Sequence, residues 1–174
     1  ARAQVERDAL SDEELRSMAF LMLIAGHETT VGLISATLLR LSRQPDQRKL
    51  LLEKPELLSG GAVDEFLRFE SSNQLGNRRA TVDCRIGGVD LPAGALITLC
   101  IGAANRDPEV FPDPAVFDAD RPNLNRHLAF GGGVHTCIGG ALPRAQGEAA
   151  ITALFERFPD VRLDGEVVFA HTEF

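Results

Sequence analysis

The glycine triplet at residues 131–133 constrains this chain more than any other stretch. Three consecutive glycines do not form the interior of a helix or a strand, because glycine loses much backbone entropy there and packs no side chain. They allow a tight loop whose backbone can be approached closely, and this loop ends at Cys137. Small and apolar residues then recur with helical spacing from residue 138 to residue 154. Cys137 is therefore predicted to lie at, or just before, the N-terminus of a helix.

This placement favours a reactive cysteine, because the free N–H groups and the dipole of a helix N-terminus favour a thiolate over a thiol. A loop that presents one thiolate, and lets a flat group lie against its backbone, suits haem ligation. A phosphate loop would need Lys-Ser or Lys-Thr after the glycines, and a dinucleotide loop would need a glycine where Thr136 stands. Zinc would need more ligands than Cys137 and His135, and the chain has no C-x-x-C pair. A buried, inert cysteine after a turn is the remaining alternative.

A long helix is predicted near the start of the chain. Ser11 and Glu14 form a capping box, and the helical pattern continues for about 30 residues to Leu41 or Ser42. Residues 18–25 are apolar on all sides, so we expect this half of the helix to be buried on every side. The apolar run is too short to span a membrane.

A polar group interrupts this apolar helix at residues 26–30. Thr30 fits a hydroxyl that bonds the carbonyl four residues back. Glu28 beside Thr29 is not explained in that way. A small residue next to an acid and an alcohol suits a groove that admits a small ligand and relays protons to it.

Shorter elements are predicted after the long helix. Helical patterns cover residues 45–53 and 63–69, and the second places Glu65 and Arg68 on one face. A pair at that spacing is usually a solvated surface contact. Strand patterns follow at residues 80–85, 89–91 and 96–101, where Cys84 and Cys100 are expected to be packing residues.

The residues Phe130, Gly133, His135, Cys137 and Gly139 fit the pattern F-x-x-G-x-[HR]-x-C-x-G. This is the haem-binding loop of the cytochrome P-450 monooxygenases, and the chain resembles the soluble bacterial branch of that family over nearly all of its length. Two more signatures of the family occur upstream in the expected order. They are A-G-x-[DE]-T at residues 25–29 and E-x-x-R at residues 65–68.

The resemblance implies a fold that is mainly α with small β-sheets, namely the C-terminal haem-binding part of the cytochrome P-450 fold. Residues 1–174 would form a single partial domain, and the N-terminal half of the fold would be absent. Members of the family are more than twice as long as this chain. Locally, Pro143 falls in the helix after Cys137, and residues 71–73 are Ser-Ser-Asn where a proline is usual.

The resemblance also implies haem b, iron protoporphyrin IX, as cofactor, with Cys137 as the proximal ligand of the iron. Arg78 and His127 match positions that bind the haem propionates. Arg79 is the alternative to Arg78, and a core histidine with satisfied hydrogen bonds is the alternative for His127. The loop itself would supply the other haem contacts, which are Phe130, Gly131, His135 and Gly139.

Two further sets of residues take roles from the resemblance. Thr29 would orient and protonate bound dioxygen, and Glu28 would feed the proton route. Glu65, Arg68 and Arg121 would form a buried ion cluster that pins the haem loop to the core, a structural rather than a catalytic role.

The implied activity is a haem-thiolate monooxygenase that inserts one oxygen atom from dioxygen into a small apolar organic substrate. A ferredoxin or a reductase would donate the electrons. The alternative is a truncated, non-catalytic haem-binding remnant or self-associating fragment. In that case apolar surface left open on the long helix would drive formation of a symmetric homodimer.

The composition limits the classes of partner and the cellular compartment that we expect. The net charge of −7 argues against nucleic acid as a partner. Three cysteines without framework spacing predict a reducing compartment, the cytoplasm. The chain shows no signal peptide, so we expect a water-soluble protein without a membrane partner.

Overall fold

The computed structural model describes residues 10–168. Its longest element is α1 (Asp12–Arg43), which begins after Ser11 as predicted and ends one or two residues beyond the predicted end. The capping box is present: the Glu14 N–H donates to the Ser11 hydroxyl at 3.3 Å, and the Ser11 N–H donates to the Glu14 carboxylate at 2.8 Å. The Ser11 N–H and the Ser11 hydroxyl both donate to the Glu14 carboxylate, and these two bonds lower the pKa of Glu14. The first turn of the helix is thereby anchored without tertiary contacts.

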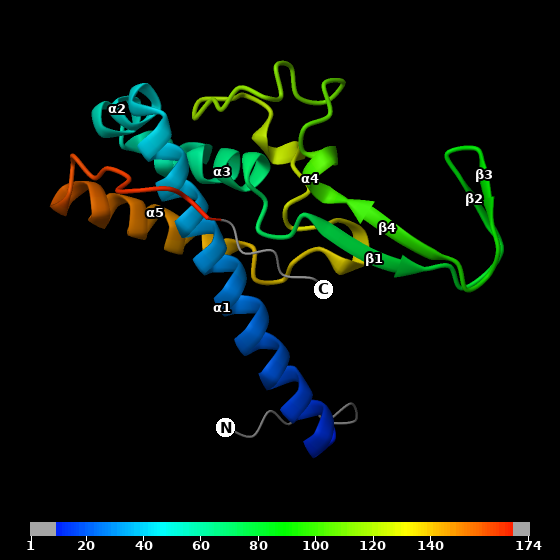
Figure 1. Ribbon diagram of the computed structural model, residues 1–174. Coiled ribbons are helices and arrows are strands. Elements are labelled where there is room, and N and C mark those ends of the chain that lie inside the picture. The colour runs from blue at the N-terminus through cyan, green and yellow to red at the C-terminus, as the bar shows by residue number, and fades with distance from the viewer. Residues whose placement is uncertain (1–9, 169–174) are drawn as a thin grey trace.

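The two halves of α1 differ in burial. The buried residues Thr30, Leu33, Thr37 and Leu41 follow helical spacing and form one stripe on the C-terminal half. The N-terminal half extends away from the rest of the molecule (Figure 1), and residues 20–24 are 44% to 70% exposed. The expectation that residues 18–25 are buried on every side is therefore wrong for the described chain, because no described element packs on this half.

Three helices pack with α1 to form the core. They are α2 (Pro45–Glu53), α3 (Val63–Phe69) and α5 (Ala141–Arg157). A π-helical turn, η1 (Leu58–Ala62), leads into α3 through Gly61, whose positive φ of 130° breaks the helical geometry. The predicted helices at residues 45–53 and 63–69 are confirmed.

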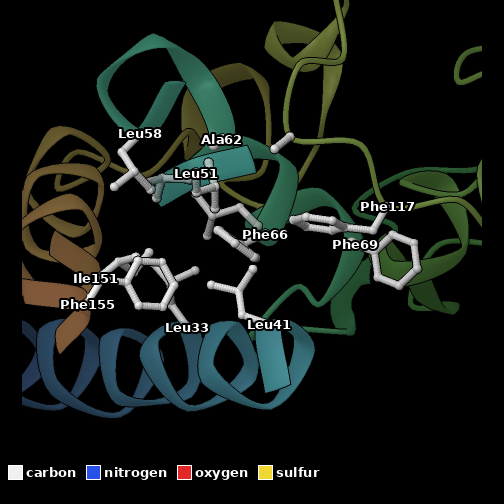
Figure 2. Packing of buried hydrophobic residues seen from close by; sticks show 13 residues of the cluster. Leu33, Leu41, Leu51, Leu58, Ala62, Phe66, Phe69, Phe117, Ile151 and Phe155 are labelled. Carbon is white, nitrogen blue, oxygen red and sulfur yellow. The ribbon is translucent and has the colours of Figure 1, made fainter. Parts of the chain in front are cut away.

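The apolar core lies where these helices meet (Figure 2). Leu33 and Leu41 of α1 belong to it together with Ile151 and Phe155 of α5, and all four are nearly inaccessible to solvent. Phe66 of α3 extends the cluster to Phe117, with ring centroids 4.7 Å apart. Because Phe117 belongs to an irregular segment, the core also fixes chain that has no secondary structure of its own.

The strands form two small antiparallel sheets. In the first, β1 (Leu75–Arg79) pairs with β4 (Leu96–Cys100); in the second, β2 (Cys84–Ile86) pairs with β3 (Val89–Leu91). The sequence pattern predicts a strand from residue 80 and none at β1, because the sequence of β1 is mostly polar and both of its faces are largely exposed. Cys100 is exposed, so its expected packing role is wrong, whereas Cys84 is half-buried.

An irregular segment connects the sheets to α5. It follows the short helix α4 (Ile101–Ala104) and runs to the 3₁₀ turns η2 (Leu124–Arg126) and η3 (Gly133–His135). The described fold is mainly helical with small sheets, as predicted.

The helix α1 is long and apolar enough to cross a membrane, since an 18-residue window within it has a mean hydropathy of 1.4. This corrects the expectation that the apolar stretch is too short. Length and composition are weak evidence for a membrane span, because the core helix of a water-soluble protein meets the same criteria.

Candidate functional site: an anchored cysteine loop

A buried ion cluster joins α3 to the irregular segment that precedes the cysteine loop. Glu65 and Arg68 are fully buried on α3, and Arg121 reaches them from the irregular segment with 8% of its surface exposed. Arg68 donates from Nε and Nη2 to the two carboxylate oxygens of Glu65, at 2.6 and 2.8 Å, and Arg121 Nε lies 3.3 Å from the same carboxylate. A buried charge needs such pairing because desolvation is costly. The structure thus brings together the three residues expected to form a structural cluster.

The two arginines also hold the irregular segment. Arg68 donates to the carbonyls of Asn105, Pro114 and Val116. Arg121 donates to the carbonyls of residues 112, 113 and 116. Backbone oxygens that lack secondary-structure partners are thereby satisfied by guanidinium groups, which explains how proline-rich chain keeps one conformation.

The cysteine loop closes on itself. The Cys137 N–H donates to the Phe130 carbonyl at 2.9 Å, and the Gly131 N–H donates to the Leu128 carbonyl at 2.9 Å. Gly131 and Gly133 have φ values of 71° and 64°, in the left-handed region that side chains other than glycine's disfavour. Two of the three consecutive glycines are therefore needed for the path of the loop.

The Cys137 thiol lies on the surface at the end of this loop. Helix α5 starts four residues later, after Gly140 as N-cap, as expected for a cysteine that precedes a helix. Pro143 lies in the first turn of α5, where its missing N–H costs nothing. The thiol and the loop also line a cavity of about 230 Å³ with Phe130 and Arg144.

The surroundings of Cys137 fit a haem group. Val134 and Ile138 on either side of the thiol are 97% and 91% exposed, which leaves an apolar surface for a flat apolar ring to cover. Residues 10–168 contain no cluster of three His, Cys, Asp or Glu side chains that could hold a metal alone. One thiolate suits a metal whose other ligands come with a cofactor, as in haem.

The structure places the other expected haem contacts as follows. His135 ends η3 and is exposed, on the same loop as the thiol. Arg78 and Arg79 are adjacent on β1, so their side chains leave opposite faces of the strand. Arg79 donates to the Gly94 carbonyl across the sheet at 2.7 Å, whereas within residues 10–168 Arg78 donates only to the carbonyl of its neighbour Asn77. Arg78 is thus the more available of the two.

His127 is buried, and both of its ring nitrogens are used. Its Nε2 lies 3.1 Å from the Asp64 carboxylate, and its Nδ1 accepts the Ala129 N–H at 3.1 Å. Since Nδ1 accepts, the ring hydrogen is on Nε2. This is the arrangement of a core histidine with satisfied hydrogen bonds, the alternative that the sequence left open.

The acid–alcohol pair lies on α1 beside the segment that follows α3. The Thr29 hydroxyl donates to the Ala25 carbonyl at 2.6 Å, as Thr30 does to Gly26 at 3.2 Å, so both threonines bond back to the helix. Glu28 is exposed. Ser72, in the segment that follows α3, donates its hydroxyl to the Thr29 carbonyl at 2.7 Å.

Sequence reasoning missed Asp64, Arg144 and Ser72. Asp64 precedes the E-x-x-R pattern, and Arg144 lies seven residues after Cys137, but no spacing rule connects them. Their connection is visible only once α3 and α5 pack together.

The profile of the cytochrome P450 family matches residues 1–166, and the chain belongs to this family. The biotin biosynthesis cytochrome P450 of Bacillus subtilis is 46% identical over 158 residues, which cover 91% of this chain and 40% of the relative. Cytochrome P450 107B1 of Saccharopolyspora erythraea is 48% identical over 157 residues, 90% of this chain and 38% of the relative. The chain thus spans about two fifths of the length of these curated relatives. Members of the family bind haem b.

Solved structures of cytochrome P450 proteins superpose on this chain. P450BioI, crystallised with an acyl carrier protein ligated to hexadec-9Z-enoic acid, superposes with a TM-score of 0.87 at 46% identity, over 91% of this chain and 41% of that one. CYP109E1 from Bacillus megaterium, in complex with testosterone, superposes with a TM-score of 0.90 at 36% identity, over 99% of this chain and 48% of that one. The predicted fold, a haem-binding portion of the cytochrome P450 fold, is confirmed.

Proposed function

We propose that this chain carries the haem-binding and oxygen-activating part of a haem-thiolate monooxygenase. The observation that supports this most is the Cys137 thiol, exposed among apolar side chains on a loop anchored at both ends. Residues 1–174 would act as one partial domain of a larger fold, in line with the two fifths of each relative that the chain matches.

In this proposal Cys137 would hold the haem iron as a thiolate, and residues 130, 131, 135 and 139 would form the wall of the haem site. Arg78 is the propionate partner on β1, whereas His127 supports the loop from below through Asp64. The chemistry that haem supplies when bound is the reductive activation of dioxygen and the transfer of one oxygen atom to an organic substrate.

The polar pair on α1 manages protons in this proposal. The Thr29 hydroxyl donates its hydrogen to the Ala25 carbonyl, so the hydroxyl oxygen can still accept a hydrogen bond. To donate a proton, Thr29 must release the Ala25 carbonyl and then be reprotonated. The exposed Glu28 carboxylate, its neighbour in the sequence, can take up a proton from solvent and pass it on.

The proposed partners are dioxygen, a small apolar organic substrate, and a ferredoxin or reductase as electron donor. The relatives cited above are bacterial proteins, which supports the cytoplasm as the place of action. The relatives act on or bind diverse molecules. One of these relatives, from Pseudonocardia autotrophica, is named vitamin D(3) 25-hydroxylase.

The direct test is the absorption spectrum of the reduced protein with carbon monoxide. Cys137→Ser should abolish the red-shifted band that a thiolate ligand produces, whereas Cys84→Ala and Cys100→Ala should keep it. If the band survived in Cys137→Ser and was lost in either control, Cys137 would not be the ligand.

A second candidate, a haem-binding chain without substrate chemistry, is favoured by the exposed N-terminal half of α1. Residues there, including Phe20 and Leu23, are 65% and 70% exposed, so Thr29 lacks a dry pocket within the described chain. Turnover with a surrogate reductase and a panel of apolar substrates distinguishes the two candidates. Tightly coupled product formation by the 174-residue chain would exclude the second.

A further inference from the structure

Helix α3 carries two adjacent carboxylates that hold different parts of the chain. Glu65 binds the arginines of the buried cluster and so fixes the irregular segment. Asp64, one residue earlier and so about 100° around the helix, points to the two ends of the cysteine loop instead. Its partners are His127 and Arg144.

The geometry around Asp64 is complete. Its Oδ1 accepts from Arg144 Nε at 2.7 Å and from His127 Nε2 at 3.1 Å. Both partners also bind the backbone: His127 Nδ1 accepts the Ala129 N–H, and Arg144 donates to the Gly140 carbonyl at 3.1 Å. One carboxylate therefore joins chain on both sides of the loop.

Burial and charge show that this is more than a surface contact. The side chains of His127 and Asp64 are 2% and 19% exposed, and that of Arg144 is 42% exposed. Burial raises the pKa of Asp64, but the hydrogen bonds from His127 and Arg144 outweigh it, so the pKa lies below its ordinary value of 3.8. Asp64 is thus a charged group in a largely enclosed position, with both partners in place.

The same side chains enclose Phe130. The Arg144 guanidinium lies 4.5 Å from the centre of the Phe130 ring, and the His127 ring lies 5.6 Å away on centroids. The carbonyl of Phe130 accepts the Cys137 N–H. A continuous series of contacts therefore runs from Asp64, through Arg144 and Phe130, to the backbone of the cysteine.

We propose that Asp64 is a positioning residue that, with His127 and Arg144, clamps both ends of the loop to α3 and so sets the place and direction of the Cys137 thiol. The inference rests on the proposed function, since it concerns the group that would bind iron. Asp64 acts through Phe130 and touches neither iron nor substrate.

The test uses the full chain without haem first. In a Cys84→Ala, Cys100→Ala background only Cys137 reacts with a thiol reagent, and mass spectrometry follows amide exchange over residues 128–137. Asp64→Ala should speed both loop exchange and thiol labelling by about tenfold, since a charged hydrogen-bond acceptor is lost. Asp90→Asn, which removes an exposed partner of Arg85 in the far sheet, is the matched control and should change neither.

A double-mutant cycle with Arg144→Met tests whether Asp64 and Arg144 act together. The double variant with Asp64→Ala should loosen the loop no more than either single variant, whereas independent contributions would multiply. The isosteric Asp64→Asn keeps the fold and should give a smaller effect of the same sign. Loop exchange unchanged in all variants would overturn the proposal.

The reduced carbon monoxide spectrum then separates this inference from the proposed function. In haem-loaded Asp64→Ala the share of the red-shifted band should fall, with the rest at shorter wavelength, while haem content is measured separately. If Cys137→Ser loses the band and Asp64→Ala keeps it in full, the positioning role fails and the ligand assignment stands. If Cys137→Ser keeps the band, the proposed function itself fails.

Discussion

The buried Glu65 carboxylate accepts four hydrogen bonds: two from Arg68, one from Arg121 and one from the Asp118 N–H. Glu65→Ala would leave two guanidinium groups buried and without their anion. Removal of one partner from such a cluster costs about 3–5 kcal/mol. We expect the variant to be insoluble, or to lose that much free energy of unfolding in chemical denaturation.

Glu53→Ala is the matched control for this prediction. Glu53 also pairs with a cation, Lys49, at 3.7 Å, but both side chains are more than 60% exposed. Exposed pairs contribute little, so the free energy of unfolding should change by less than about 0.5 kcal/mol. Equal effects of the two substitutions would contradict the special role of the buried cluster.

Asp64 predicts a pH dependence of stability. Its pKa is lowered in the folded chain, so the ionised form stabilises the fold, and the unfolded chain binds the proton more readily. The stabilisation is complete above the ordinary value of 3.8 and is lost as the pH falls through the lower folded value. The difference in unfolding free energy between the wild type and Asp64→Asn should be constant at neutral pH and shrink below about pH 4. A difference that grew in acid would have the wrong sign.

At the scale of elements, Gly147 decides how closely α5 can approach its neighbours. A Cβ at this position would lie 3.0 Å from Val63 Cγ1 on α3 and 3.5 Å from Leu33 Cδ2 on α1. Gly147→Ala should therefore lower the free energy of unfolding by about 1–3 kcal/mol through overpacking, although alanine is the better helix former.

Gly26 is the control that the chain offers, since it is also helical but a Cβ there meets nothing within 4 Å. Gly26→Ala should raise the stability of the isolated chain by up to about 1 kcal/mol. Thermal denaturation of both variants gives the comparison. Two shifts of the same sign would mean that packing at residue 147 is looser than the structure shows.

At the scale of the whole molecule, the exposed half of α1 dominates. Its contiguous apolar side chains are unusual for a monomer, because monomeric proteins rarely expose apolar patches beyond a few hundred Å². We expect the 174-residue chain to self-associate with rising concentration, which light scattering measures. Phe20→Gln with Leu23→Gln should weaken this association, whereas Leu75→Gln, at an exposed position on β1, should not. A wild-type chain that stayed monomeric would disprove the expectation.

The sequence by itself determined the local features. The capping box of Ser11 and Glu14 set the start of α1, because its hydrogen bonds are made within four residues. The glycine loop and the helix after Cys137 could also be predicted, since glycine conformations and helical periodicity are local properties. The family signatures then supplied the fold and the cofactor, including the link between Arg121 and Glu65.

Only the tertiary structure decided the contacts between distant segments. Nothing local connects Asp64 with His127 and Arg144, because their pairing arises only when α3, the loop and α5 pack at one place. The burial of α1 was mispredicted for the same reason. An apolar pattern indicates that burial of a helix face is favourable. Whether the face is in fact buried depends on which other chain segments pack against it.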